Sequence, residues 1–132
     1  ALGEVHTATG QGAPVSWFKM GSGWSWLRAN DAAAADHAQA ARDGWREIAR
    51  CLASEEHDFY VLDEFTYPLD WGWIDVDEVV SVLSQRPGRQ HVIITGRRAP
   101  AKLIDAADLV TEMVKVKHPM DAGRKGQKGI EW

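Results

Sequence analysis

The longest patterned stretch of the chain has apolar residues at helical spacing. Asn30 or Asp31 can cap a helix at its start, and Ala53 lies near its expected end. Its apolar positions are Ala41, Trp45, Ile48 and Leu52. The spacing predicts one amphipathic helix with a single buried face over this range.

Two short apolar runs have the pattern of buried parallel strands. "DFYVLDEFTY" and "HVIITGR" are continuously apolar and then end abruptly in polar residues. Between them, Asp75 and Glu78 form a capping box for a helix that Pro87 and Gly88 end. The inner face of that helix is expected to be Val76, Val79, Val80 and Leu83.

Three further elements complete the expected order. "APVSWFKMG", residues 13–21, reads as a strand that enters a loop, and "DLVTEMVKVK", residues 108–117, reads as another strand. Between them, Pro100 suits the first turn of a short helix through Leu103 and Ile104. Strands alternating with helices predict a single α/β domain over residues 1–132, with a three-layer, mostly parallel sheet. Ligands of such sheets bind outside the carboxyl ends of the strands.

Composition narrows the class of protein. The 132 residues are 45% hydrophobic and 26% charged, as in ordinary globular domains, and the net charge of −4 argues against general nucleic-acid binding. No apolar run is long enough to span a membrane, and the start does not resemble a signal peptide. The single cysteine, Cys51, cannot form an internal disulfide, so we expect a cytoplasmic protein. The segment from Lys115 onward is locally basic and rich in glycine.

Tryptophan is the compositional outlier, with seven residues in the chain. Trp45 is expected in the core. The tryptophans in or beside predicted loops are Trp17, Trp24, Trp26, Trp71 and Trp73. These side chains could pack beneath their own loops, contact a flat apolar ligand, or form a subunit interface.

The polar residues that follow the two buried strands are the candidates for chemistry. Asp63 and Glu64 end an apolar strand, as do the acids that orient Mg²⁺ in nucleotide-hydrolysing α/β proteins; capping of the next turn is the alternative for Asp63. Thr95 could donate a hydroxyl hydrogen bond and Arg97 could bind a phosphate; the alternative for Arg97, which its position after a strand favours, is an ordinary surface arginine. A nucleotide-binding loop G-x-x-x-x-G-K-[ST] is absent from the sequence, and the five scattered histidines show no metal-ligand spacing.

Five motifs in order resemble the corrinoid adenosyltransferases of the phosphate-loop type, the cob(I)yrinic acid a,c-diamide adenosyltransferases. They are "GSGWSW", "YVLDEFTY", "RPGRQHVIITGR", "ADLVTEM" and "VKHPMDAGRKGQKGIEW", and they run from about Val15 to the C-terminus. The resemblance implies a RecA-like fold and an enzyme that transfers the 5′-deoxyadenosyl group of ATP to the cobalt of a reduced Co(I) corrinoid, releasing triphosphate, in adenosylcobalamin biosynthesis.

The same resemblance implies roles for particular residues. Trp24 and Trp26 would lie beside the corrin ring and remove the lower axial ligand of cobalt, which makes reduction to Co(I) easier. Asp63 and Glu64 would hold Mg²⁺, and Thr95 with Arg97 would lie on the nucleotide side. The family signature in the tail has no assigned role; its members here are His118, Asp121, Lys125 and Gln127.

The family also implies partners: ATP, cob(I)alamin or cob(I)yrinic acid a,c-diamide, an electron donor for Co(II), and a second copy in a homodimer. Its members carry the phosphate loop ahead of the segment with which this chain begins, so we expect a domain truncated at its N-terminus relative to the family. Two alternatives remain open: a catalytically incomplete corrinoid-binding module, and an unrelated α/β ATPase fragment whose tryptophans form a partner interface.

Overall fold

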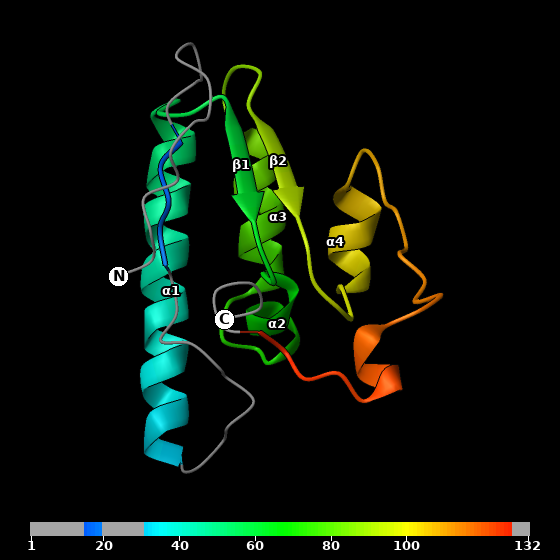
Figure 1. Cartoon of the computed structure of the whole chain (residues 1–132). Helices are drawn as coiled ribbons and strands as arrows, with labels where there is room; N and C mark the ends of the chain where they lie inside the picture. The colour runs from blue at the N-terminus through cyan, green and yellow to red at the C-terminus, as the bar shows by residue number, and fades with distance from the viewer. Residues whose placement is uncertain (1–14, 20–30, 128–132) are drawn as a thin grey trace.

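The computed structural model describes residues 15–19 and 31–127 (Figure 1). Its longest element is helix α1, Asp31–Ala53, which matches the predicted helix. The predicted apolar face is confirmed, because Trp45 and Leu52 are buried in the core and Ala41 and Ile48 pack against it. Trp45 also donates a hydrogen bond from Nε1 to Oε1 of Glu78 over 2.9 Å, so the polar edge of a core side chain is satisfied across elements.

The two buried strands are confirmed as a parallel pair. Strand β1, Phe59–Leu62, pairs with β2, His91–Ile94, in a register that sets Phe59 opposite His91. The pairing extends one step further, because the Thr95 amide donates to the Leu62 carbonyl over 3.1 Å. The carboxyl ends of both strands therefore meet at one edge of the sheet.

One face of this sheet is packed against helices. Tyr60 and Leu62 of β1 lie in the core together with Leu52 of α1 and Val79 of α3. The alternate positions point to the other face, where Phe59, Val61 and Ile93 are exposed. The described residues thus form one sheet layer and one layer of helices, an α/β arrangement with a small parallel sheet.

Helix α3, Val76–Gln85, begins as the capping pattern predicts, but only half of the capping box forms. The Asp75 side chain accepts a hydrogen bond from the Asp77 amide over 2.8 Å. Glu78 does not complete the box, since its carboxylate accepts the hydrogen bond from the Trp45 indole instead. The core tryptophan of α1 therefore binds the Glu78 side chain, which the sequence pattern had assigned to the capping box at the start of α3.

Two short helices flank the carboxyl edge of the sheet. Helix α4, Ala101–Ala106, is the predicted short helix and buries Leu103. Helix α2, Thr66–Asp70, directly follows the β1 turn and was not predicted. Five residues including a proline carry too little periodicity to be recognised from sequence.

Both weaker strand predictions are wrong for the described residues. Residues 15–19 have no regular structure, and neither do residues 107–117, which precede the 3₁₀ helix η1, Pro119–Ala122. In Figure 1 the segment after α4 runs on the side of α4 away from β2. A strand needs a neighbouring strand for its backbone hydrogen bonds, and none of the described strands lies beside this segment.

The helices seen in residues 31–127 are all too short or too polar to cross a lipid bilayer.

Candidate functional site

The predicted site residues of the two strands lie together at the carboxyl edge of the sheet. Asp63 and Glu64 follow β1, and Thr95 follows β2. The Thr95 hydroxyl donates to Oδ1 of Asp63 over 2.6 Å and accepts the Glu64 amide over 3.0 Å. Thr95 therefore fixes the acidic turn by two bonds, which places it as a residue that orients Asp63.

Thr66 joins the turn after β2 to the turn after β1. This residue was not identified from the sequence. Thr66 is 3% exposed, and its hydroxyl donates to the Arg97 carbonyl over 2.8 Å. Gly96 has a φ of +142°, and a Cβ added there would lie 1.9 Å from the Thr66 Oγ1. Glycine is thus required in "TGR" both by its backbone conformation and by this close approach.

Two non-glycine residues of the same edge adopt left-handed backbone conformations. Glu64 has a φ of +56° and Arg98 a φ of +55°. Arg98 also forms an ion pair with Asp70, with Nη2 and Oδ2 3.2 Å apart, which joins the β2 turn to the end of α2. Such backbone strain costs on the order of 1–3 kcal/mol per residue and clusters at functional sites.

The charged groups of this edge are open to solvent. The Asp63 and Glu64 side chains are exposed, and no cationic side chain in the described ranges pairs with either. Arg97 is also exposed, and its guanidinium has no ion-pair partner within residues 15–19 and 31–127. The edge thus presents two carboxylates and a guanidinium that could contact a ligand carrying both a cation and phosphates.

The structure describes only some of the tryptophans that the sequence places in or beside loops. Trp24 and Trp26 lie outside the described residues, so their predicted contact with a corrin ring stays a prediction. Trp71 and Trp73 pack against one another with ring centroids 4.6 Å apart, and Tyr67 stacks on Trp71 at 5.3 Å. The structure therefore shows Trp71 and Trp73 packed against neighbouring aromatic side chains.

The tail signature forms a small structure of its own around η1. His118 begins it, with Nδ1 accepting the Met120 amide over 3.1 Å. Asp121 pairs with Lys115 over 2.9 Å. Lys125 and Gln127 are exposed beyond it. His118 thus serves as a local cap, one of the ordinary roles of a loop histidine.

The comparison with known families bears directly on the resemblance seen in the sequence. The whole chain, residues 1–132, matches the family model described as ATP:corrinoid adenosyltransferase BtuR/CobO/CobP. This chain belongs to that family. The resemblance seen in the five sequence motifs is thereby confirmed.

Individual relatives carry the same description. A corrinoid adenosyltransferase of Pseudomonas aeruginosa is 41% identical over 121 residues, which cover 89% of this chain and 57% of the relative. The corrinoid adenosyltransferase CobA of Salmonella typhimurium is 41% identical over 118 residues, covering 89% and 59%. A corrinoid adenosyltransferase of Sinorhizobium is 38% identical over 125 residues, covering 92% and 56%. The chain thus spans somewhat more than half the length of the curated relatives it matches.

Proposed function

We propose that this protein transfers the 5′-deoxyadenosyl group of ATP to the cobalt of a Co(I) corrinoid in adenosylcobalamin biosynthesis. The electron pair of Co(I) forms the bond to the 5′ carbon, and the bond from that carbon to oxygen breaks as triphosphate leaves. The observation that carries the proposal is the carboxyl edge of the sheet, where Thr95 contacts the Asp63 carboxylate and the Glu64 amide while Thr66 contacts the Arg97 carbonyl.

Asp63 and Glu64 are the residues that would hold Mg²⁺. The ion prefers oxygen ligands and is commonly bound by one or two carboxylates together with substrate phosphates. The two side chains fit this role because they are adjacent and exposed, and Thr95 already fixes one of them. When bound, Mg²⁺ would neutralise charge on the leaving triphosphate. Arg97 would bind phosphate oxygens through its planar guanidinium.

The corrin side of the site would come from the "GSGWSW" motif. Trp24 and Trp26 would face the cobalt and keep an axial donor away from it, which eases the reduction to Co(I). Their apolar rings would also exclude water from that reactive species. An external electron donor would supply the reducing electron.

The proposal extends to the complete fold and assembly. Phe59, Val61 and Ile93 are apolar yet exposed on the outer face of the sheet, and parallel sheets are normally covered on both faces. This supports a three-layer, phosphate-loop-like sheet in the protein. A homodimer is part of the same proposal and rests on the family motifs alone, whereas the proposed cytoplasmic location also rests on the single cysteine.

The test is anaerobic incubation of the chain with ATP, Mg²⁺ and a chemically reduced corrinoid, followed by the corrinoid absorption spectrum. We expect the light-sensitive alkyl-cobalt spectrum to develop. Asp63→Asn and Glu64→Gln should each slow its appearance by more than the roughly 10- to 100-fold typical of losing an outer partner of a metal site, because both side chains would be direct ligands. Asp58→Asn is the matched control, since Asp58 is exposed at the opposite end of β1.

One result would contradict the role of the acidic turn, and another would contradict the transferase. Equal slowing by Asp58→Asn would show that loss of any exposed carboxylate near β1 has the same effect, so the acidic turn would have no special role. Corrinoid binding without alkylation, in the presence of ATP and Mg²⁺, would instead support the catalytically incomplete corrinoid-binding module.

A further inference from the structure

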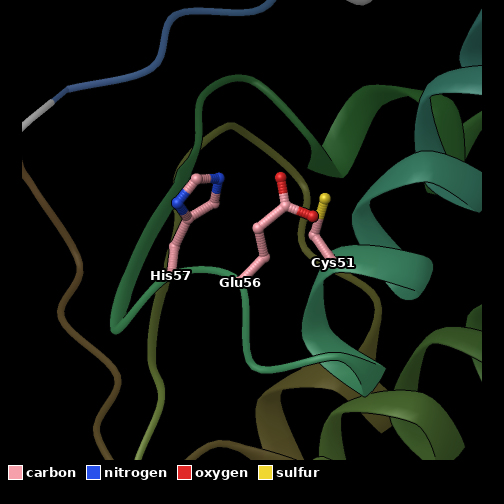
Figure 2. Close-up of side chains that lie close together, drawn as sticks. All are labelled: Cys51, Glu56 and His57. Carbon is pink, nitrogen blue, oxygen red and sulfur yellow. The ribbon is translucent and has the colours of Figure 1, made fainter.

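A second group of potential ligands lies at the amino end of β1, away from the acidic turn. One ligand atom each from Cys51, Glu56 and His57 lies within 4.8 Å of the others. Figure 2 shows the Glu56 carboxylate directed toward the Cys51 sulfur, with the His57 ring on the other side of Glu56. We refer to these three residues as the Cys51 cluster.

The chain path brings the cluster together where α1 ends. Cys51 is on the last turn of α1 and is 5% exposed. The Glu56 amide donates to the Cys51 carbonyl over 3.0 Å, and Glu55 turns the chain with a φ of +53°. The loop therefore folds back over the helix end, so three residue types that bind metals lie side by side.

Two buried polar atoms at this place have no hydrogen-bond partner among residues 15–19 and 31–127. They are Nε2 of His57 and the hydroxyl oxygen of Tyr60, a residue that is only 8% exposed. The rings of His57 and Tyr60 meet edge to face with their centroids 5.6 Å apart, so Tyr60 lies beside the cluster. A buried polar group without a partner costs about 1–3 kcal/mol, so a ligand that binds Nε2 of His57 would be favourable.

The formal charge of the groups around the cluster is negative, which favours binding of a cation. Arg50 Nη2 lies 2.7 Å from a Glu47 oxygen, 2.9 Å from a Glu56 oxygen and 3.3 Å from the Cys51 sulfur. Two carboxylates thus face one guanidinium, which leaves a formal charge of −1 while the thiol is protonated. A divalent cation that displaces the thiol proton into solvent brings the group to neutrality, and the Glu47–Arg50 pair is kept.

We propose that Cys51, Glu56 and His57 bind Zn²⁺. Thiolate sulfur, imidazole nitrogen and carboxylate oxygen are its usual ligands, and three protein ligands leave a fourth position for water. The exposed Glu56 side chain would exchange its contact with Arg50 for the metal, and the ligand atoms would contract toward tetrahedral spacing. Because the site joins the end of α1 to the start of β1, bound Zn²⁺ would hold these two elements together independently of the acidic turn.

Co²⁺ is the probe for the first experiment, carried out in the absence of corrinoid. Cys51 is the only cysteine of the chain, so a thiolate-to-cobalt charge-transfer band can arise from this residue alone. We expect the band to appear at one equivalent of Co²⁺ and to be removed by Zn²⁺. The thermal midpoint of unfolding should also rise with Zn²⁺ concentration, as for any ligand that binds the folded state.

Variants then test whether the three residues act together. Glu56→Gln and His57→Gln should each weaken Co²⁺ binding by more than the roughly 10- to 100-fold typical of losing an outer partner of a metal site. Glu55→Gln and His91→Gln are the matched controls and should bind as the parent does, since neither residue is in the cluster. Circular dichroism checks that each variant is folded.

Absence of the charge-transfer band would overturn the proposal. So would a band that Glu56→Gln and His57→Gln leave unchanged, because the metal would then be held by the thiol alone. If His57→Gln fails to fold, Glu56→Gln decides the outcome, since Glu56 is exposed and its replacement keeps the side-chain shape.

Discussion

At the scale of single residues, the carboxyl edge of the sheet depends on small side chains that hold larger ones. Thr95 bonds both to the Asp63 carboxylate and to the Glu64 amide, and Thr66 bonds to the Arg97 carbonyl. Gly96 leaves the space that Thr66 occupies. Two threonines and a glycine therefore fix the Asp63 carboxylate and the backbone that carries Glu64 and Arg97.

Gly96→Ala should destabilise the protein by about 2 kcal/mol or more, because the added Cβ meets Thr66 and the backbone conformation is strained for any other residue. Urea unfolding followed by circular dichroism measures the change. Gly72→Ala is the matched control. Gly72 also has a positive φ, +68°, but an added Cβ would meet none of the described residues within 4 Å, so about 1 kcal/mol is expected. Equal losses for the two variants would mean that the contact with Thr66 has no effect.

At the scale of elements, helices α3 and α4 are joined at the surface by one ion pair. Lys102 Nζ lies 2.6 Å from both carboxylate oxygens of Asp77, near the start of α3. The hydrogen bond to Asp77 raises the pKa of Lys102 above its ordinary value of 10.5. Since both side chains are well exposed, the pair contributes little at neutral pH.

The raised pKa of Lys102 gives a pH dependence with a definite sign. The folded protein holds this proton more tightly than the unfolded chain, so the stabilisation is complete below the unfolded pKa and is lost as pH rises through the folded value. Lys102→Met should therefore lose less stability than the parent between neutral pH and about pH 11. Urea unfolding at both pH values measures this, with Lys117→Met as a control that should behave as the parent does.

At the scale of the whole molecule, the described part divides into a core and an exposed apolar segment. The core joins α1, the two strands, α3 and α4 through buried residues such as Leu52 and Val79, both 0% exposed. In contrast, Leu109 is 84% exposed within residues 107–117. Apolar sequence alone therefore does not identify which segments stabilise this structure.

Two leucines provide a matched test of that division. Leu52→Ala should lower the free energy of unfolding by about 2–5 kcal/mol, because it removes a buried side chain and leaves a cavity. Leu109→Ala should change it by less than about 0.5 kcal/mol, because its side chain lies in solvent. A large loss for Leu109→Ala would show that residues 107–117 pack against the rest of the molecule in solution.

Much of the fold was predictable because it follows from local periodicity. Helical spacing located α1 and the inner face of α3, and continuous apolar runs ending in polar residues located β1 and β2. The meeting of Asp63 with Thr95 followed from the rule that parallel strands end at one edge. The short helix α2 was missed, and residues 107–117 were assigned wrongly, because a strand depends on a partner that lies elsewhere in the chain.

The sequence by itself determined the family, through five motifs that occur in order. It also determined the main helices and strands, through the spacing of their apolar residues. Tertiary structure decided the partners of individual side chains. Glu78 bonds to Trp45 across two helices, Thr66 fills the space at Gly96, and Cys51 lies beside Glu56 and His57. The physical reason is that periodicity reports which face of an element is buried, whereas hydrogen bonds and ligand clusters depend on distances that only the packed chain sets.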